Sequence, residues 1–353
     1  MPVKKDYKVF SSKNQEKSFE FPHEWLKKWV FRRAKTMEVA KAYENYGDDH
    51  LKTKSKKLKQ CGSFMLFDSC PNISEGHTKT LTSGNFCDDR LCSICNKRRA
   101  ISQISSLIPS IREQLHENSS YKLIFLTLTI KNLSKIDKIV YKNLLKNWRK
   151  FQYNFLLGRT TKRKENGEKC NVYNGSCVGG IMTIETTYNN NKQNWHPHIH
   201  ALLICKDYLN QKKASEYWYK LTGDSFIVSL NKVRPKKNFY KTEVNNKVEY
   251  GLIGGVIETV KYLAKLNKDM PGEKIVELAE ALKRVRCVNA FGVLKGYMVR
   301  AREKRNEALK EKKCTKCGKS LIEIALKWYS NGYYIKNHTE EKEYYSSCDC
   351  ICS

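Results

Sequence analysis

The chain has 353 residues and a formal net charge of +30 at pH 7, from 66 lysines and arginines against 36 aspartates and glutamates. This length suggests two or three domains, and this charge favours a polyanionic partner, most simply nucleic acid. No run approaches the roughly 18–20 apolar residues of a membrane span, and the first residues lack the apolar stretch of a signal peptide. We therefore expect a cytoplasmic protein without a membrane partner, whose 14 cysteines serve as thiols and metal ligands instead of disulfides.

The first half of the chain predicts helices and one strand around a cysteine-rich segment. Apolar residues recur at helical spacing over residues 23–46, and a basic stretch then leads into the first group of cysteines. Residues 99–117 are predicted as a second helix, and residues 121–132, rich in β-branched and aromatic side chains, as a strand. A long helix over residues 135–156 follows.

The second half predicts a β-hairpin followed by mixed elements. Two extended runs, 179–188 and 194–205, are separated by a short polar turn, which is typical of a hairpin. The elements expected after it are a helix over 208–221, a strand over 225–233, a helix over 254–267 and basic helices to about residue 312. Because strands and helices mix without regular βαβ alternation, we expect an α+β fold with an antiparallel sheet.

The second strand of this hairpin, NWHPHIHALLIC, carries histidines at three alternate positions, 196, 198 and 200. Side chains two apart in a strand share one face about 7 Å apart, so His198 and His200 are candidates to hold one divalent ion such as Mg²⁺ or Mn²⁺. Glu185 on the preceding strand is the candidate third ligand, because hairpin neighbours lie only about 5 Å apart. The alternatives are a polar sheet edge with surface histidines and a solvent-facing glutamate.

A second candidate motif is VIETVKYLAK, in which Glu258 and Tyr262 are four apart and share one face of a helix. Lys261 and Lys265 flank the tyrosine. A phenol titrates near pH ~10, so a nucleophilic tyrosine needs cationic neighbours or a metal-polarised target. The alternative is that Tyr262 packs in the core.

The cysteines predict zinc sites. Cys87, Cys92 and Cys95 follow the spacing C-x4-C-x2-C, and CxxC is typical of tetrahedral Zn²⁺. Cys61 and Cys70 are both candidates for the fourth ligand, and buried free cysteines are the alternative. A second zinc ribbon is predicted in the tail, with Cys314, Cys317, Cys348 and Cys350 as ligands and Cys352 as an alternative.

Taken together, the motifs resemble a known enzyme class. The segments FLTLTIKN, HPHIH and ETVKYLAK are similar, in this order, to the three motifs of HUH endonucleases. The nearest resemblance is to the rolling-circle replication initiator (Rep) family of small bacterial plasmids, whose cysteine signature is similar to CGSFMLF (61–67) and FCDDRLCSICNKRRA (86–100). FGVLKG (291–296) also fits, and the resemblance covers about residues 60–300. Ser93 stands where the family usually has proline.

The resemblance implies an antiparallel-sheet HUH core flanked by helices and a role for each motif. His198 and His200 would hold the ion that polarises a phosphate of single-stranded DNA, while His196 lies outside the ligand set. Tyr262 would attack the phosphorus, which gives a 5′-phosphotyrosine and a free 3′-hydroxyl that a polymerase extends. Glu258 would activate a water for the second cut, and Cys61 would complete the zinc site.

The same reading predicts three regions and several partners. The regions are a helical and zinc-binding part (1–100), the catalytic domain (101–300), and a basic helix with a cysteine-rich tail (301–353). Single-stranded DNA and double-stranded origin DNA are the expected partners, with a DNA polymerase. A separate host helicase is also expected, because CGKS at 317–320 lacks the upstream glycine of a Walker-type loop.

Two other functions fit parts of the pattern. A single-strand DNA transposase of the HUH type shares the nicking chemistry, but such chains are usually shorter and lack the cysteine group. A non-catalytic, zinc-bearing DNA-binding regulator would use the histidines structurally and would show no metal-dependent cleavage. A zinc deaminase is disfavoured, because the motif of His338 and Glu340 is followed by CDC instead of a PCxxC run.

Overall fold

A computed structural model gives the fold of the chain in two compact units. The first unit is Met1–Cys95 with Glu307–Ser353, and the second is Asn96–Asn306. The residues that the structure describes are 23–72, 77–163, 169–233, 256–257, 259, 266, 269–297, 312–314, 316–329 and 332–337. Within these ranges, no helix combines the length and the apolar character needed to span a bilayer.

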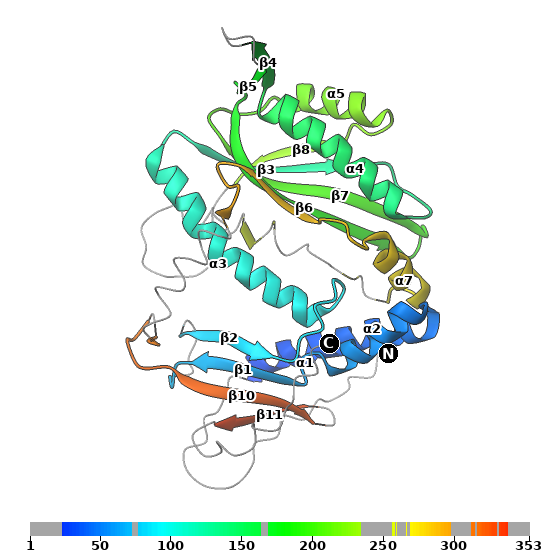
Figure 1. The fold of residues 1–353 in the computed structure, drawn as a ribbon, viewed down its shortest axis with the longest axis vertical. Coiled ribbons are helices and arrows are strands. Elements are labelled where there is room, and N and C mark those ends of the chain that lie inside the picture. The colour runs from blue at the N-terminus through cyan, green and yellow to red at the C-terminus, as the bar shows by residue number, and fades with distance from the viewer. Residues whose placement is uncertain are drawn as a thin grey trace. The chain divides into compact units, whose positions relative to one another are not determined.

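The first unit is built from segments at both ends of the sequence. Its elements are the helices α1 (His23–Tyr46) and α2 (Asp49–Gln60) and the strands β1 (Phe64–Ser69), β2 (Lys79–Gly84), β10 (Ile322–Tyr329) and β11 (Gly332–Asn337). The strands form one antiparallel sheet in the order β11-β10-β1-β2 (Figure 1). Ser69 lies opposite Ile322, so strands from the two ends of the sequence pair directly.

Helix α1 packs on this sheet through aromatic side chains. The rings of Trp25 and Trp29 meet the ring of Phe67 in β1 edge-on, with centroids 4.9 and 5.7 Å apart. Burial of each such ring contributes about 1.5–3 kcal/mol. The hydroxyl of Ser55 in α2 donates to the carbonyl oxygen of Ala40 in α1 at 2.7 Å, which joins the two helices.

The second unit has a five-stranded sheet as its centre. Its strands are β3 (Lys122–Thr129), β6 (Cys177–Asn189), β7 (Asn194–Cys205), β8 (Val228–Lys232) and β9 (Val288–Gly292). They are antiparallel throughout, in the order β8-β3-β7-β6-β9. The other elements are α3 (Ser93–Glu117), α4 (Lys138–Lys150), a π-helix (Phe151–Leu156), a small hairpin of β4 (Arg159–Arg163) and β5 (Lys169–Tyr173), α5 (Gln211–Thr222) and α7 (Gly272–Ala281). The predicted α+β class with antiparallel sheets is confirmed.

Helices cover both faces of this sheet (Figure 1). On one face, Leu107 and Ile111 of α3 belong to a buried core with Leu202 and Ile204 of β7. On the other face, the hydroxyl groups of Tyr141 in α4 and Thr186 in β6 lie 2.7 Å apart. The central strand β7 is therefore buried on both sides, which explains why its apolar run continues without polar interruption.

Most of the predicted elements are confirmed. The helices expected over 23–46, 99–117 and 208–221 correspond to α1, α3 and α5. The hairpin expected from 179–188 and 194–205 corresponds to β6 and β7. The strands expected near β3 and β8 are also present.

Two expectations need correction. The helix expected from residue 135 begins at Lys138, because the Asp137 carboxylate caps it by accepting hydrogen bonds from the backbone amides of Ile139 and Val140 at 2.8 and 2.9 Å. The basic helices expected to residue 312 are interrupted by β9, which pairs with β6. Gly292 ends β9 with φ +58°, and a Cβ there would collide with the carbonyl oxygen of Val178, so glycine permits this close pairing.

Candidate active site and metal-binding groups

Helix α3 covers one face of the five-stranded sheet. One half of this face carries polar side chains instead of apolar ones. Glu185 of β6 lies opposite His198 of β7, and Thr183 lies opposite His200. Residues directly opposite one another project to the same side of a sheet. On the other flank of β7, two threonines of β3 share this face, since Thr129 lies opposite His198 and Thr127 opposite His200. Three neighbouring strands thus contribute to one polar patch.

Of the three predicted ion ligands, Glu185 and His200 are in contact within this patch, while the ring centroids of His198 and His200 lie 6.1 Å apart. The Nε2 atom of His200 lies 2.8 Å from Oε2 of Glu185, and both side chains are almost fully buried, with 11% and 7% exposed. The Nδ1 atom of His200 lies 3.1 Å from the Thr127 hydroxyl, and Nδ1 of His198 lies 3.3 Å from the Thr129 hydroxyl. In both rings, Nδ1 is thus engaged by a threonine, which orients the ring, while Nε2 of His200 faces the Glu185 carboxylate.

The electrostatics of the patch favour neutral imidazoles. Burial, together with the neighbouring His200 and His196, lowers the pKa of His198 to about 4 against the opposing effect of Glu185. Burial and Lys192 also lower the pKa of His196. At neutral pH the rings of His196 and His198 are therefore unprotonated, and a neutral imidazole is the form that binds a metal. His196 stacks near His198, with ring centroids 6.4 Å apart.

The second predicted motif falls largely outside the described residues, which include neither Glu258 nor Tyr262 nor Lys265. Its described neighbours lie on the histidine face of the sheet. Val256 is buried in the same core as α3, and the carbonyl oxygen of Thr259 accepts a hydrogen bond from the Thr183 hydroxyl at 2.9 Å. The segment that precedes Tyr262 is therefore attached to β6 directly across from His200.

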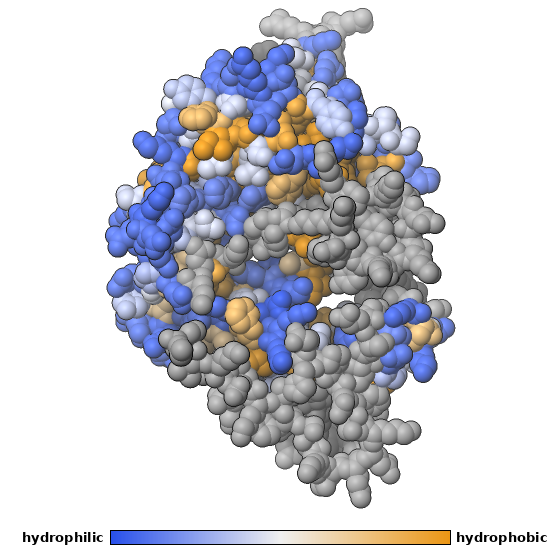
Figure 2. Space-filling model, turned by 180° about the vertical axis from the view of Figure 1, so that it is seen from behind, coloured by the Kyte–Doolittle hydropathy of each residue, from blue (hydrophilic) through white to orange (hydrophobic). Residues whose placement is uncertain are grey.

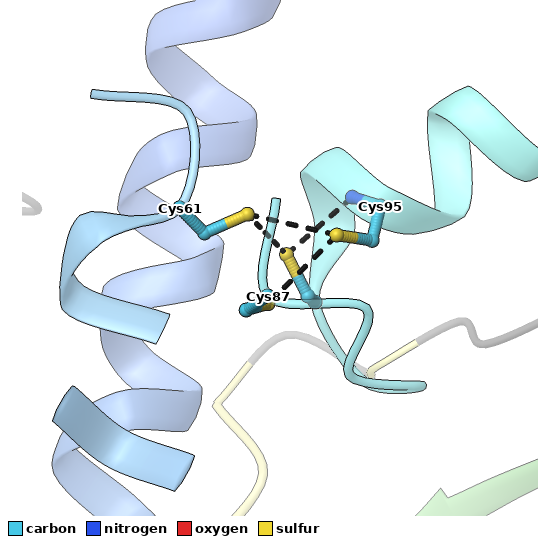
Figure 3. Close-up of side chains that lie close together, drawn as sticks. Cys61, Cys87 and Cys95 are labelled. Carbon is cyan, nitrogen blue, oxygen red and sulfur yellow. Dashed lines mark hydrogen bonds between the residues drawn. The ribbon is translucent and has the colours of Figure 1, made fainter. Parts of the chain in front are cut away.

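Four cysteine thiols of the first unit converge on one point (Figure 3). The Sγ atom of Cys61 lies 3.4 Å from that of Cys92 and 3.6 Å from that of Cys95, and Cys87 lies 3.8 Å from Cys95. All four ligand atoms lie within 4.8 Å of one another. Cys61 follows α2, Cys87 follows β2, Cys92 directly precedes α3, and Cys95 lies in its first turn. Of the two candidates for the fourth position, it is Cys61 that lies here.

Neighbouring groups support this arrangement. Hydrogen bonds from the thiols of Cys61, Cys87 and Cys95 lower the pKa of Cys92, whereas hydrogen bonds with the same cluster raise the pKa of Cys87. Four sulfur atoms at this spacing cannot all be thiolates without a cation, and a divalent ion supplies one. The backbone amide of Cys95 donates to the Cys92 sulfur at 3.4 Å, and the Arg33 guanidinium donates to the Cys61 carbonyl oxygen. The group can hold a metal ion.

Cys314 and Cys317 belong to a second group whose other members are Cys70 and His77. Cys348 and Cys350, the partners expected from the sequence, lie outside the described residues. His77 was not among the predicted ligands, although it stands only seven residues after Cys70 and two residues before the start of β2.

The surface is suited to a polyanion. Hydrophilic residues cover most of the coloured surface in Figure 2, in keeping with the net charge of +30. Beside the β4–β5 hairpin, the guanidinium carbon of Arg159 lies 5.1 Å from the ring centroid of the half-exposed Tyr153. Exposed cations beside aromatic rings can contact phosphates and stack on bases.

Comparisons with known proteins agree with these observations. The "Protein rep" of Streptococcus pneumoniae serotype 2 (strain D39 / NCTC 7466) is 24% identical over 278 residues, which cover 76% of this chain and 77% of that protein. A "Protein rep" of a Bacillus species is 26% identical over 269 residues, 70% of this chain and 81% of that protein. A third, from Staphylococcus aureus, is 26% identical over 191 residues, 51% of this chain and 75% of that protein. No solved structure shows a significant match.

The family comparison covers most of the second unit and reaches into both segments of the first. The model of a family described as "Replication protein" matches residues 78–335, well over half of the chain. The resemblance to Rep proteins expected from the sequence is thereby confirmed. The chain belongs to this family of replication proteins.

Proposed function

We propose that this plasmid replication initiator nicks one strand of its origin by rolling-circle chemistry. The Tyr262 oxygen attacks a phosphorus of single-stranded DNA, and the bond from phosphorus to the 3′-oxygen breaks. The products are a 5′-phosphotyrosine and a 3′-hydroxyl that a polymerase extends. The observation that carries the proposal is the buried pair of Glu185 and His200, which lies across from the Thr183–Thr259 hydrogen bond.

The residues on the polar patch fit a divalent ion. The imidazoles of His198 and His200 and the carboxylate of Glu185 offer a mixed nitrogen and oxygen donor set that suits Mg²⁺ or Mn²⁺. When bound, such an ion would act as a Lewis acid that polarises the phosphate oxygens. The threonines at 127 and 129 hold the rings, and the apolar core below the patch limits access of water to them.

The chain connection keeps the nucleophile near this patch. Tyr262 follows Thr259 by three residues, so their Cα atoms are separated by no more than about 11 Å. We propose that Lys265 stabilises the negative charge that develops on the attacking phenol. Glu258, four residues before the tyrosine, then serves as the general base that activates a water for the second cut.

We further propose that Cys61, Cys87, Cys92 and Cys95 hold a structural Zn²⁺. The sulfur separations of 3.4–3.8 Å support this proposal, because four ligands at about 2.3 Å from a tetrahedral zinc lie about 3.8 Å apart. The initiator would act in the cytoplasm on double-stranded origin DNA and on the single strand exposed from it. A host helicase and a DNA polymerase would continue the reaction.

The test is a nicking reaction with a supercoiled plasmid that carries the cognate origin. With Mn²⁺, wild-type protein should convert the plasmid to open circles and leave a covalent adduct, and EDTA should prevent both. His198→Ala and His200→Ala should abolish nicking and keep duplex binding, because phosphate contacts come from lysine and arginine. His196→Ala is the matched control, because it removes a histidine from the same face of the same strand.

Three outcomes would contradict the proposal. The metal site is wrong if His198→Ala and His200→Ala nick at the wild-type rate. The patch has another role if His196→Ala is as inactive as they are. Specific origin binding without any cleavage would instead favour a non-catalytic regulator.

A further inference from the structure

A second group of metal ligands lies at the turn end of the β1–β2 hairpin, in the first unit. We infer that Cys70, His77, Cys314 and Cys317 form a second zinc site, separate from the four-cysteine group. The Cys70 sulfur lies 3.5 Å from that of Cys317 and 3.4 Å from Nδ1 of His77. The Cys314 sulfur lies 3.5 Å from the same nitrogen. This inference concerns the first unit alone and does not rest on the nicking chemistry.

The separations match a tetrahedral site with three sulfurs and one nitrogen. Bond lengths of about 2.3 Å to sulfur and about 2.0–2.1 Å to nitrogen place sulfur atoms about 3.8 Å apart and a sulfur about 3.6 Å from a nitrogen. A disulfide between Cys70 and Cys317 would need a separation of about 2.05 Å. The observed distance of 3.5 Å fits two ligands of one ion and not a disulfide.

The backbone explains why these four residues meet. Ser69 at the end of β1 pairs with Ile322 at the start of β10, so the chain that follows β1 and the chain that precedes β10 lie at one end of the sheet. The Cys70 amide donates to the Thr78 carbonyl oxygen at 2.9 Å, which closes the hairpin turn and places His77 beside Cys70. The sheet itself thus positions both halves of the site.

A tight turn presents the other two ligands. The Gly318 amide donates to the Cys314 carbonyl oxygen at 2.9 Å, and the Cys314 amide donates to the Lys319 carbonyl oxygen at 2.8 Å. Gly318 has φ +70°, which glycine adopts without strain. The turn therefore holds Cys314 and Cys317 on one side, with Cys314 buried and Cys317 exposed.

Two of the four proposed ligands are buried. Cys70 and Cys314 are only 1% and 3% exposed. The Asn72 amide donates to the Cys70 sulfur at 3.3 Å, a contact that stabilises a thiolate ligand. Buried sulfurs and an imidazole in this arrangement suit a closed structural zinc site.

The two ligand groups occupy opposite ends of one hairpin. Cys61 precedes β1 and Cys87 follows β2, whereas Cys70 and His77 lie in the turn between the strands. The second ion would therefore connect the N-terminal hairpin to the segment that leads into β10, a connection that the first ion does not make. Loss of the second ion should destabilise the pairing of β10 with β1 and leave the four-cysteine group intact.

Zinc content of the full-length protein tests the inference. Protein purified without added metal and passed through a desalting column should contain two Zn²⁺ per chain. Cys317→Ser should contain one, because this exposed residue contributes a ligand and little packing. His77→Ala should also lose one equivalent, and His77→Cys should regain it as a fourth thiolate. The control is Cys170→Ser, which lies outside both ligand groups and should keep two.

Hydrogen exchange gives an independent readout. In Cys317→Ser, and in wild type treated with a chelator, the amides of Ile322–Tyr329 should exchange at least tenfold faster, while those of Asn194–Cys205 should not change. The inference is overturned if wild type holds one zinc that Cys317→Ser retains. A Cys70–Cys317 disulfide, detected by mass spectrometry in protein purified with reductant and without oxidant, would overturn it as well.

Discussion

The hydroxyl of Thr183 donates a hydrogen bond to the carbonyl oxygen of Thr259 at 2.9 Å, and both residues are fully buried. Thr183 stands opposite His200 on β7, so a single position of β6 adjoins both a proposed ion ligand and the segment that precedes Tyr262. A replacement at this position should therefore disturb the placement of the nucleophile without removing a ligand.

Thr183→Val keeps the shape of the side chain and removes its hydroxyl. The variant loses a buried hydrogen bond to the Thr259 carbonyl oxygen, which should lower the free energy of unfolding by about 0.5–1.5 kcal/mol. We expect slower formation of the covalent adduct, at unchanged affinity for Mn²⁺. The rate is measured by quenched-flow electrophoresis of an origin oligonucleotide, and the affinity by calorimetry.

Thr186→Val is the matched control for this variant. Thr186 lies on the opposite face of the same strand, where its hydroxyl meets that of Tyr141 at 2.7 Å. It should lose a similar free energy of unfolding and form the adduct at the wild-type rate. Equal slowing in both variants would show that general loss of stability, and not placement, limits the reaction.

Thr127→Val tests whether the Thr127 hydroxyl positions His200 in the proposed ion site. The Thr127 hydroxyl lies 3.1 Å from Nδ1 of His200 and fixes the ring. Loss of such a partner typically reduces metal affinity or activity about 10–100-fold, and we expect an effect of this size on the Mn²⁺ concentration required for nicking. Thr160→Val, in the exposed β4, should leave that concentration unchanged. An unchanged requirement in Thr127→Val would mean that His200 is not a ligand.

Tyr262→Phe removes only the proposed nucleophilic oxygen. The protein–DNA adduct should disappear completely, while binding of origin DNA and the thermal unfolding midpoint stay close to wild type. Electrophoresis under denaturing conditions measures the adduct. An adduct that persists and maps by mass spectrometry to a different tyrosine would assign the role to that residue.

Glu258→Ala separates initiation from termination. The first nick and the adduct should remain near normal, because in the proposed mechanism Tyr262 performs that step. Termination should fall sharply, because no carboxylate activates water for the second cut. Circle release from a plasmid that carries two origin copies provides the measurement. Glu258→Gln should behave as the alanine variant does, and equal termination by all three proteins would leave the residue without this role.

Cys92→Ser removes one ligand of the four-cysteine group. Structural zinc in small domains contributes about 10–16 kcal/mol of apparent binding free energy, which is comparable with the whole stability of a domain, about 5–15 kcal/mol. We expect the loss of one zinc and rapid amide exchange in α1. Cys287→Ala, a buried thiol outside both ligand groups, should retain its zinc and its exchange pattern. Full zinc content in Cys92→Ser would exclude this residue as a ligand.

The sequence predicted the histidine hairpin well because its signals are local. Alternation of His196, His198 and His200 marks a strand, and the short polar turn fixes which residue of the preceding strand can face them. The structure brings Glu185 opposite His198, as a hairpin requires, yet the carboxylate contacts His200. That choice depends on side-chain rotamers, which a spacing pattern does not contain.

The first unit could not be predicted in the same way. β1 pairs with β10, more than 250 residues later in the chain, and each of these strands is short. Strand pairing at such separation leaves no periodic signal within a window of sequence. The same separation in sequence explains why the partners of Cys314 and Cys317 could not be predicted. Cys70 and His77 become their neighbours only when the sheet has formed.

The first unit is built from both ends of the chain, and this has a consequence for synthesis of the protein. Residues 23–95 leave the ribosome first, but β1 gains its second neighbour only when β10 has been made, after the whole of residues 96–306. At about 5–20 residues per second, that stretch takes on the order of 10–40 s. During this time one edge of β1 stays unpaired, and an unpaired edge is a site of aggregation. A product that terminates before residue 312 would thus contain the histidine strand but would be prone to aggregate, so incomplete translation yields little active initiator.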